Sequence, residues 1–437
     1  MLWALLIVFT FLLLAIAVWR LHPFPALILA AILTGALNEL SATKIIAGMY
    51  SGMGDTLGPV AAVIGLGVML GALLTESGAA AVISNRLVRQ WGIKHIQTAV
   101  VITSFVCGVA LFYNAGFVVL LPLVLSLAKQ AAVPAPFLAL SMAAALSVTH
   151  GYLPPHPGPT AIASLLGAHM GKTLLYGFIA AVPAIIVGGW WFPKTVKHLQ
   201  SSIAAGMPPP AANEKPNIPF GAGLLVALLP VLLMATGIVV QQISLPNNQL
   251  MKTIGVLLAD PLLALLLSFL CALILFSRFK KNALAQLSEK SAAALQSVAG
   301  IIFIIGGGGA LKQMLVDTGS AAAISQVFVQ WQLHPLLSAW LVATAVRIAI
   351  GSATVAGITA AGVVQPLIAA TGTSPELMVL AIGAGSLMCS HLNDSGFWMF
   401  KEYLGLSVVD TFRSWTVMET LVGITGLLMV LLMNQFV

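Results

Sequence analysis

Polar and helix-breaking residues are concentrated at four short interruptions of an otherwise apolar chain. The interruptions lie at residues 108–116, 150–160, 351–357 and 390–396. Short hydroxyl and amide side chains beside glycine suit exposed backbone near a ligand, and helix ends there offer free N–H or C=O groups. Helix N-termini in particular favour anions. This pattern predicts non-covalent binding of a small hydrophilic solute. The alternative is that serine and threonine hydroxyls bond back to carbonyls at kinks.

The densest interruption lies within residues 143–163. This stretch contains two histidines, four prolines, two glycines and a tyrosine, with apolar sequence on both sides. Proline removes a backbone donor and clashes with the preceding helical turn, and the residue before it is pushed toward an extended conformation. Non-helical backbone at membrane depth is tolerated only where it is buried in protein or lines a water-filled cavity. We therefore expect a broken helix at residues 150–160 that faces the solute.

Two charged residues lie in or beside the interruptions of the second half. Arg347 lies shortly before Gly351, near the end of an apolar segment. An arginine in such a place is a functional-site candidate by default, and its guanidinium fork suits a carboxylate of the solute. The alternative is a structural or snorkelling cation. Asp394 lies in the last interruption and is a candidate for carrying a proton, with a helix cap or an ion pair with Lys401 as the alternatives.

Two histidines occupy related positions, His150 in the first half and His391 in the second. Histidine titrates near neutral pH, so either ring is a candidate for carrying a proton, although a lone histidine is more often structural. The candidates for hydrogen bonds to the solute are Ser352, Thr354, Asn114, Thr149, His150 and Asn393. No Cys, His and carboxylate cluster has the spacing of metal ligands, so neither a metal nor another cofactor is predicted.

The composition defines the kind of element that must position these residues. Of 437 residues, 59% are hydrophobic and 7% are charged, whereas a soluble domain carries roughly 25% charged residues. The mean hydropathy is +1.04, so we expect an all-α polytopic membrane protein. The net charge of +7 comes from residues that lie mostly at segment ends, as in membrane proteins, and does not indicate nucleic-acid binding. Three scattered cysteines predict no disulfide framework.

Apolar segments of about 20 residues, long enough to span a bilayer, organise the chain. They lie near residues 2–19, 24–39, 57–75, 96–112, 172–192, 219–240, 255–277, 292–310, 333–350 and 414–435, with shorter interrupted pieces at 113–129, 135–163, 351–371 and 375–400. Residues 1–19 have no basic start and no small-residue cleavage site, which predicts a first transmembrane helix and not a signal peptide. A hydrophilic linker at residues 193–218 divides the chain into membrane repeats at 1–192 and 219–437.

The two sides of this linker resemble each other. Residues 76–84 match residues 317–325 at an offset of 241, and the pair 149–150 falls on 390–391 at the same offset. Two further matches follow in the same order, residues 119–123 with 363–367 and residues 166–167 with 404–405. Single matches are weak evidence in so apolar a chain, but four in the same order predict a two-fold internal repeat.

Smaller features of the repeat have structural interpretations. Glu76 and Asp317 each precede a glycine and an alanine-rich run, which predicts helix N-caps. The four glycines at 306–309 are not followed by a GK[ST] motif, so they predict close helix packing or a hinge and not a phosphate loop. The chain shows no nucleophile–base pattern and no nucleotide motif, which argues against a membrane hydrolase and an ATP-driven pump. A channel is an alternative, because broken helices also line pores.

Basic residues indicate how the two repeats are oriented. The basic segments are 20–23, 86–94, 193–218 and 278–290, and the repeat counterparts of the second and fourth carry one or no Lys or Arg. Because basic loops are cytoplasmic, we expect these segments inside, and their counterparts and both chain termini outside, in the periplasm. The halves are then inverted repeats. Inverted repeats with discontinuous helices are a transporter architecture, with the solute near the midplane.

Four motifs carry a resemblance to a known family. They are LSVTHGYLPPHPGPTAIA at 146–163, GGGGALKQMLVDTGS at 306–320, RIAIGSATVAGITAAG at 347–362 and SHLNDSGFWMFKEY at 390–403. Over nearly its whole length the chain resembles the gluconate permease family of proton symporters. The resemblance implies an inner-membrane carrier that takes up D-gluconate with a proton. The family also contains carriers for related sugar acids and for D-serine, which are the alternatives, and the proline-rich run at 153–159 resembles the gluconate branch.

The wider group implied by this resemblance has inverted repeats, each of which supplies a re-entrant helical hairpin. A transport domain moves against a scaffold, usually in a homodimer. On this basis the breaks at 112–116 and 351–357 are hairpin tips or unwound turns around the solute. One position departs from the family, in which an acidic residue usually follows the aromatic pair at 112–113, because this chain has Asn114. The proton site is therefore expected at the histidines and the aspartate named above, unless coupling is altered.

Overall fold

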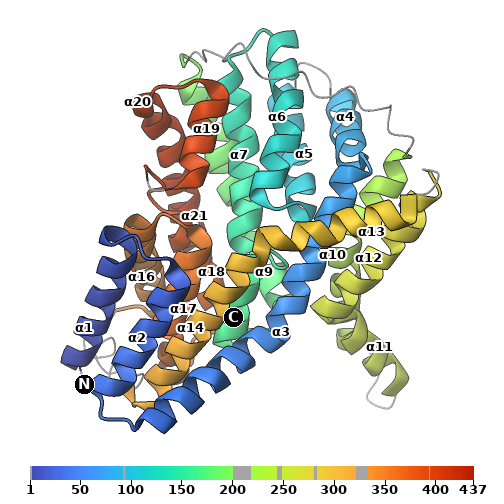
Figure 1. The fold of residues 1–437 in the computed structure, drawn as a ribbon. Coiled ribbons are helices and arrows are strands. Elements are labelled where there is room, and N and C mark those ends of the chain that lie inside the picture. The colour runs from blue at the N-terminus through green and yellow to red at the C-terminus, as the bar shows by residue number, and fades with distance from the viewer. Residues whose placement is uncertain are drawn as a thin grey trace.

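The computed structural model describes residues 2–91, 95–199, 218–243, 249–279, 283–320, 333–392 and 394–437. Every regular element in these stretches is a helix, and none is a strand (Figure 1). Eight of these helices are long and apolar enough to cross a membrane, or nine if the bent pair Gln249–Ala259 and Pro261–Ser277 forms one span. The prediction of an all-α polytopic membrane protein is confirmed.

The first half of the chain, within the described residues, consists of α-helices joined by short connections. They are α1 (Leu2–Leu13), α2 (Pro23–Leu37), α3 (Ala42–Glu76), α4 (Ala79–Trp91), α5 (Ile96–Ala110), α6 (Tyr113–Gln130), α7 (Ala135–Tyr152), α8 (Pro157–Leu166) and α9 (Met170–Ile185). A π-helical stretch, Ile186–Trp191, and a 3-10 helix, Phe192–Val196, continue α9 into the predicted linker. Most of that linker, residues 200–217, lies outside the described residues.

The second half begins with helices that pack beside the first half and ends with those that complete the cavity described below. They are α10 (Phe220–Ile243), α11 (Gln249–Ala259), α12 (Pro261–Ser277), α13 (Ala283–Ala293), α14 (Ala299–Asp317), α16 (Pro335–Ile350), α17 (Ala353–Thr371), α18 (Pro375–Leu387), α19 (Ser395–Leu404), α20 (Val408–Thr411) and α21 (Val417–Met433). A 3-10 turn, Ala294–Val298, joins α13 to α14, and a π-helical stretch, Phe412–Thr416, joins α20 to α21.

Each of the four predicted interruptions separates two helices. The gaps are residues 111–112 between α5 and α6, 153–156 between α7 and α8, 351–352 between α16 and α17, and 388–394 between α18 and α19. Pro157 is the first residue of α8, where its missing N–H is not needed. Gly351 ends α16 with φ of 84°, a conformation that glycine adopts without a steric penalty. The predicted broken helices are therefore confirmed, with local sequence causes.

Helix boundaries recur in the same order in the two halves. The starts of α5, α6 and α8 are Ile96, Tyr113 and Pro157, and the starts of α16, α17 and α19 are Pro335, Ala353 and Ser395. The spacing between members of each pair is nearly constant and is close to the offset that the sequence motifs show. Left-handed glycines end both α8 and α19. The order of elements therefore repeats along with the motifs.

The glycine run at 306–309 lies inside α14 and brings that helix close to its neighbours. A Cβ atom on Gly309 would clash with the backbone of Gly52 in α3, and one on Gly308 would clash with Ile358 in α17. Figure 1 shows α14 running alongside α3, and α14 also contacts α2 and α17. Close helix packing, one of the two interpretations of this run, is confirmed.

Three predicted membrane segments differ from the helices that form. α3 begins at Ala42, well before the predicted segment 57–75, because its polar residues Tyr50 and Asp55 lie on an exposed side and do not interrupt it. The predicted segment 255–277 is bent by 73° between α11 and α12. The cause is Asp260, whose carboxylate caps α12 immediately before a proline. The predicted segment 292–310 begins with the 3-10 turn and continues as α14 to Asp317.

The predicted N-cap role of Glu76 and Asp317 is wrong. These residues are the last residues of α3 and α14, so they lie at helix C-termini. At the start of α4 the hydroxyl of Ser77 accepts the N–H of Ala79 at 3.3 Å instead. Gly78, with φ of 78°, separates the two helices. An acidic residue shortly before a glycine can end one helix or cap the next one. The local sequence does not distinguish these two positions.

Candidate functional site

A cavity of about 730 Å³ lies where the four helix breaks meet. This volume falls within the roughly 300–1,000 Å³ of small-molecule sites in proteins. The walls come from both halves of the chain. The predicted site residues that line the cavity are Asn114, His150, Arg347, Ser352, Thr354 and Asp394. The structure therefore brings together six side chains that come from both sides of the predicted linker.

The four helices that follow a break all begin at this cavity. The lining residues from their first turns are Tyr113, Asn114 and Ala115 of α6, Pro157 of α8, Ala353 and Thr354 of α17, and Ser395 and Gly396 of α19. The first N–H groups of a helix have no partner within the helix, and they carry the positive end of its dipole. Convergent helix N-termini form a site that attracts an anion.

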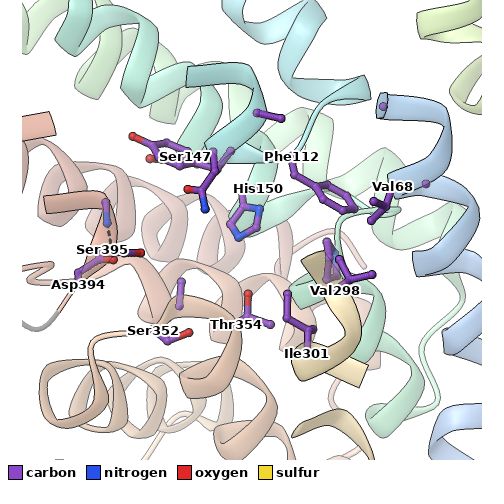
Figure 2. A pocket seen from close by; sticks show the side chains of 18 of the residues that line it. Val68, Phe112, Ser147, His150, Val298, Ile301, Ser352, Thr354, Asp394 and Ser395 are labelled. Carbon is purple, nitrogen blue, oxygen red and sulfur yellow. Dashed lines mark hydrogen bonds between the residues drawn. The ribbon is translucent and has the colours of Figure 1, made fainter. Parts of the chain in front are cut away.

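The cavity has an apolar side and a polar side (Figure 2). The labelled apolar side chains are Val68, Phe112, Val298 and Ile301, and they gather on one side of the view. On the other side are Ser352, Asp394 and Ser395, while His150 and Thr354 lie between the two groups. Such a division suits a solute with polar groups along one face and C–H groups along the other.

Arg347 joins the two breaks of the second half. Its side chain is 2% exposed. One terminal nitrogen donates to the carbonyl of Gly351 in the first break, and the other donates to Oδ2 of Asp394 in the second. Asp394 also accepts the Ser390 hydroxyl and, at 2.9 Å, the N–H of Gly396. The guanidinium thus has a carboxylate partner within the protein, while its Nε has no hydrogen-bond partner among the described residues.

The alternative interpretations of Asp394 have different outcomes. Asp394 is the N-cap residue of α19, so the predicted helix cap is confirmed. Its ion pair is with Arg347 and not with Lys401, whose Nζ lies 2.8 Å from Glu402 instead. In the first half, the equivalent N-cap position is that of α8, which is His156. The His156 Nε2 atom lies 2.7 Å from the carbonyl of Gly108.

The two predicted histidines occupy different environments. His150 lines the cavity, and its Nδ1 atom is buried without a hydrogen-bond partner among the described residues. Its ring centroid is 5.5 Å from that of His156 and 6.4 Å from that of Tyr113. His391 is not among the lining residues, and its backbone carbonyl accepts the N–H of Asp394 at 2.8 Å. The repeat relationship between the two positions therefore does not extend to their surroundings.

The remaining predicted ligands are also divided. Ser352 is the N-cap of α17, where its hydroxyl accepts the N–H of Val355 at 3.3 Å, and it lines the cavity. Thr149 is fully buried and is not a lining residue, and its hydroxyl donates to the carbonyl of Leu146 at 2.8 Å. This is the back-bonding that was the alternative for such hydroxyls. Asn393 lies outside the described residues.

Glu419 is a lining residue that the sequence reasoning missed. It lies in the first turn of α21 and is 2% exposed. Its Oε1 atom accepts the hydroxyl of Ser147 in α7, while Oε2 has no hydrogen-bond partner among the described residues. The signal was present in the sequence, because a single carboxylate lies in the apolar segment 414–435 and an ionisable residue in such a segment is a functional candidate.

The sequence reasoning also missed an ion pair where α3 and α13 meet the cavity. Glu76 forms an ion pair with Lys290, and both residues line the cavity. The side chains are 39% and 49% exposed, so solvent screens this pair far more than the buried pair of the second half. Within the described residues, no group of three or more His, Cys, Asp or Glu side chains is arranged to hold a metal ion.

Comparison with protein families and curated proteins gives consistent results. The family described as GntP family permease matches residues 1–436. The high-affinity gluconate transporter of Escherichia coli (strain K12) is 43% identical over 420 residues, which cover 96% of each chain. The Gnt-II system L-idonate transporter of the same strain is 43% identical over 95% of each chain, and the gluconate permease of Bacillus subtilis (strain 168) is 38% identical over 96% of each.

Solved structures resemble this fold at much lower identity. The crystal structure of the Alcanivorax borkumensis YdaH transporter superimposes with a TM-score of 0.68 at 16% identity, and covers 95% of this chain and 98% of that one. The structure of Neisseria gonorrhoeae MtrF gives a TM-score of 0.67 at 13% identity, over 94% of each chain. At these identities the similarity shows a shared fold.

Proposed function

Because this chain belongs to the GntP family of permeases, we propose that it imports D-gluconate, or a related sugar acid, by proton symport. As a member of this family the chain is a transporter and not an enzyme. The substrate proposal rests on relatives named gluconate transporter or permease, three of which are 38–43% identical over nearly the full length. The relative named L-idonate transporter makes that sugar acid the first competitor to test.

The observation that carries this proposal is the convergence of four helix N-termini on one cavity. A sugar acid has one carboxylate, for which positive dipole ends and the first N–H groups of α6 and α17 are suitable partners. The start of α8 is Pro157, which has no N–H, and the Gly396 N–H of α19 already donates to Asp394. Its hydroxyls need hydrogen bonds, which Ser352, Thr354 and Asn114 supply in our proposal. The apolar side of the cavity accommodates the C–H face of the carbon chain.

The sequence suggested either Arg347 or a helix N-terminus as the partner of the solute carboxylate. The geometry favours the helix N-termini, because Arg347 already bonds to Asp394 and to the Gly351 carbonyl. In our proposal Arg347 holds the two breaks together through its two terminal nitrogens. Its fork therefore fixes the relative position of the starts of α17 and α19.

The proton-coupling residues proposed from the sequence are His150, His391 and Asp394. Of these, His150 lines the cavity with a buried Nδ1 atom that has no partner among the described residues, Asp394 is bonded to Arg347, and His391 is not a lining residue. Symport of one proton with one monoanion is electroneutral. A pH gradient should therefore drive uptake better than a voltage alone.

We propose that the architecture serves alternating access. Residues 1–192 and 219–437 would be inverted repeats, with a transport domain that moves against a scaffold in a homodimer. The protein would lie in the cell inner membrane with both termini in the periplasm. The recurrent helix boundaries support the repeat. An impermeant thiol reagent added to intact cells should label Phe436→Cys, and labelling only after lysis would contradict the orientation.

The test is uptake of radiolabelled D-gluconate into proteoliposomes, with and without an inward proton gradient. Unlabelled D-gluconate, L-idonate and D-serine serve as competitors. Accumulation that needs the gradient and is blocked best by gluconate is the expected result. Accumulation blocked chiefly by D-serine would move the substrate to that branch of the family. Uptake that follows a sodium gradient instead would overturn proton coupling, and entry without uphill accumulation or saturation would indicate a channel.

A further inference from the structure

Three carboxylates line the cavity among the described residues, and they differ in whether a cationic side chain is paired with them. Asp394 is paired with Arg347, and Glu76 is paired with Lys290. Glu419 also lines the cavity, but no cation forms an ion pair with it among the described residues. Its environment is therefore the least suited of the three to a permanent negative charge.

The surroundings of Glu419 are buried and come from several helices. Ser147 of α7 donates to Oε1, and the buried Oε2 has no hydrogen-bond partner among the described residues. The charged groups that act on Glu419 are Arg347 of α16 and Asp394 before α19, which are bonded to each other. The titratable neighbours are Tyr113 of α6 and Tyr152 of α7, and the Tyr152 hydroxyl donates to a backbone carbonyl of α21 at 2.7 Å.

The charge balance of the cavity links a proton to the solute. Arg347 and Asp394 cancel each other, so an ionised Glu419 would be the uncompensated buried charge among these three groups. A carboxylate solute in the same cavity would add a second negative charge close by. Like charges in a low-dielectric site repel strongly, and this repulsion favours the neutral form of one of them. Protonation of Glu419 would remove this repulsion.

We propose that Glu419 carries the coupled proton, and that repulsion between its carboxylate and the solute anion links proton binding to solute binding. This inference rests on the proposed symport. The proton would bind at Oε2, while Ser147 continues to donate to Oε1. Because coupling between two sites is reciprocal, a bound proton strengthens solute binding and a bound solute strengthens proton binding by the same factor.

The first test separates solute movement from proton coupling. Glu419→Gln introduces a neutral side chain of the same shape, so it resembles the protonated state permanently. Exchange of internal unlabelled for external labelled D-gluconate needs no net proton movement and should stay within about threefold of wild type. In wild type, an inward gradient of one pH unit should drive about tenfold accumulation for one proton per solute. In Glu419→Gln this gradient should drive no accumulation. The matched control is Glu402→Gln, an exposed residue outside the cavity lining, which should accumulate as wild type does.

The outcomes are distinguishable from a failure of the proposed function. If wild-type protein neither exchanges nor accumulates D-gluconate, the substrate proposal fails. If wild type accumulates it and Glu419→Gln accumulates it equally well, Glu419 does not carry the proton. Loss of both exchange and accumulation in a monodisperse Glu419→Gln protein would also overturn the inference, since the side chain would then serve solute binding itself. Loss of accumulation in His150→Asn, with accumulation retained in Glu419→Gln, would transfer the role to the histidine.

A second measurement does not depend on a substituted protein. When D-gluconate is added to purified wild type in weakly buffered solution, a pH dye should report the uptake of about one proton per solute bound at a pH where Glu419 is ionised. No proton uptake between about pH 5 and 9 would overturn the inference. Glu419→Asp keeps the carboxyl group and should still take up the proton, whereas Glu402→Gln should behave as wild type.

Discussion

The two halves join their helix breaks through equivalent positions but with different chemistry. In the second half, Asp394 at the N-cap of α19 forms an ion pair with Arg347 near the end of α16. In the first half, His156 at the N-cap of α8 lies 2.7 Å from the carbonyl of Gly108 in α5. One connection is charged and the other is made by an imidazole and a carbonyl.

This difference shows that two halves with the same order of helices can connect their helix breaks with different strength. A charge-assisted hydrogen bond is roughly twice as strong as a neutral one. The breaks of the second half are therefore joined more firmly, and their fixed charges remain balanced within the protein. In the first half, His150 lines the cavity, and its buried Nδ1 atom has no hydrogen-bond partner among the described residues. We infer that the Arg347–Asp394 pair makes the connection between the breaks of the second half the more rigid of the two.

The largest expected effect comes from breaking the charged connection. Arg347→Ala leaves the carboxylate of Asp394 without its cation, which for a buried pair costs about 3–5 kcal/mol. We expect a marked fall in the thermal unfolding temperature and loss of gluconate uptake. Arg347→Lys keeps the charge but loses the fork, so it should recover only part of the stability. Unchanged unfolding of Arg347→Ala in detergent would contradict the account of the second half.

The next effect compares the two histidines at repeat-related positions. His150→Asn removes a group that faces the cavity. We expect His150→Asn to weaken the apparent affinity for gluconate by roughly 10- to 100-fold, because a hydrogen bond to a charged partner contributes about 1.5–3 kcal/mol. His391→Asn should change uptake less than about threefold, because His391 is not a lining residue. Initial rates of uptake over a range of gluconate concentrations provide the measurement. Equal effects of the two substitutions would contradict the claim that only His150 acts on the solute.

The contact between His156 and the Gly108 carbonyl should contribute less to the free energy of unfolding than the Arg347–Asp394 pair. His156→Ala removes the bond to the Gly108 carbonyl and leaves that buried acceptor unpaired, at a cost of about 1–3 kcal/mol. The loss of unfolding temperature should therefore be smaller than for Arg347→Ala in the same detergent. His156→Gln, which keeps a donor, should lie between wild type and His156→Ala. A loss as large as that of Arg347→Ala would show that the two connections are equally strong.

The smallest expected effect concerns backbone conformation at one break. Gly351 has φ of 84°, so Gly351→Ala places a side chain in the left-handed region at a cost of about 1 kcal/mol. The equivalent junction in the first half is Leu111, whose φ of −114° is ordinary for any residue. Gly54→Ala, at a glycine of ordinary φ inside α3 with no atom within 4 Å of an added Cβ, serves as the comparison. Unfolding temperatures of both variants provide the measurement, and a loss for Gly54→Ala as large as that for Gly351→Ala would contradict the conformational argument.

The sequence was sufficient to predict the breaks because their causes are local. Proline at 157 and glycine at 351 determine where helices begin or end, whatever surrounds them. Six of the predicted polar residues line one cavity for the same reason, since each lies at or near a break. The glycine run inside α14 is also a local signal, because glycine has no side chain to separate two helices.

Contacts between distant segments could not be predicted in this way. The bond between Ser147 and Glu419 joins residues far apart in the sequence, and nothing in either local sequence indicates the other. The Arg347–Asp394 pair likewise depends on how two breaks pack together, so Arg347 was assigned a free solute-binding fork and Asp394 was considered with Lys401. The N-cap prediction for Glu76 failed because the same motif fits either end of a helix.

The helix starts that line the cavity have a consequence for how this protein changes over evolutionary time. Except at α8, which begins with Pro157, their first N–H groups belong to residues other than proline, so a missense mutation alters the side chain and leaves the donor in place unless it introduces proline. Preference for an anion would then be hard to lose by drift. Discrimination between sugar acids would instead depend on replaceable side chains such as Ser352, Thr354 and Asn114. A library randomised at these three positions should yield variants with altered sugar preference that still require a carboxylate.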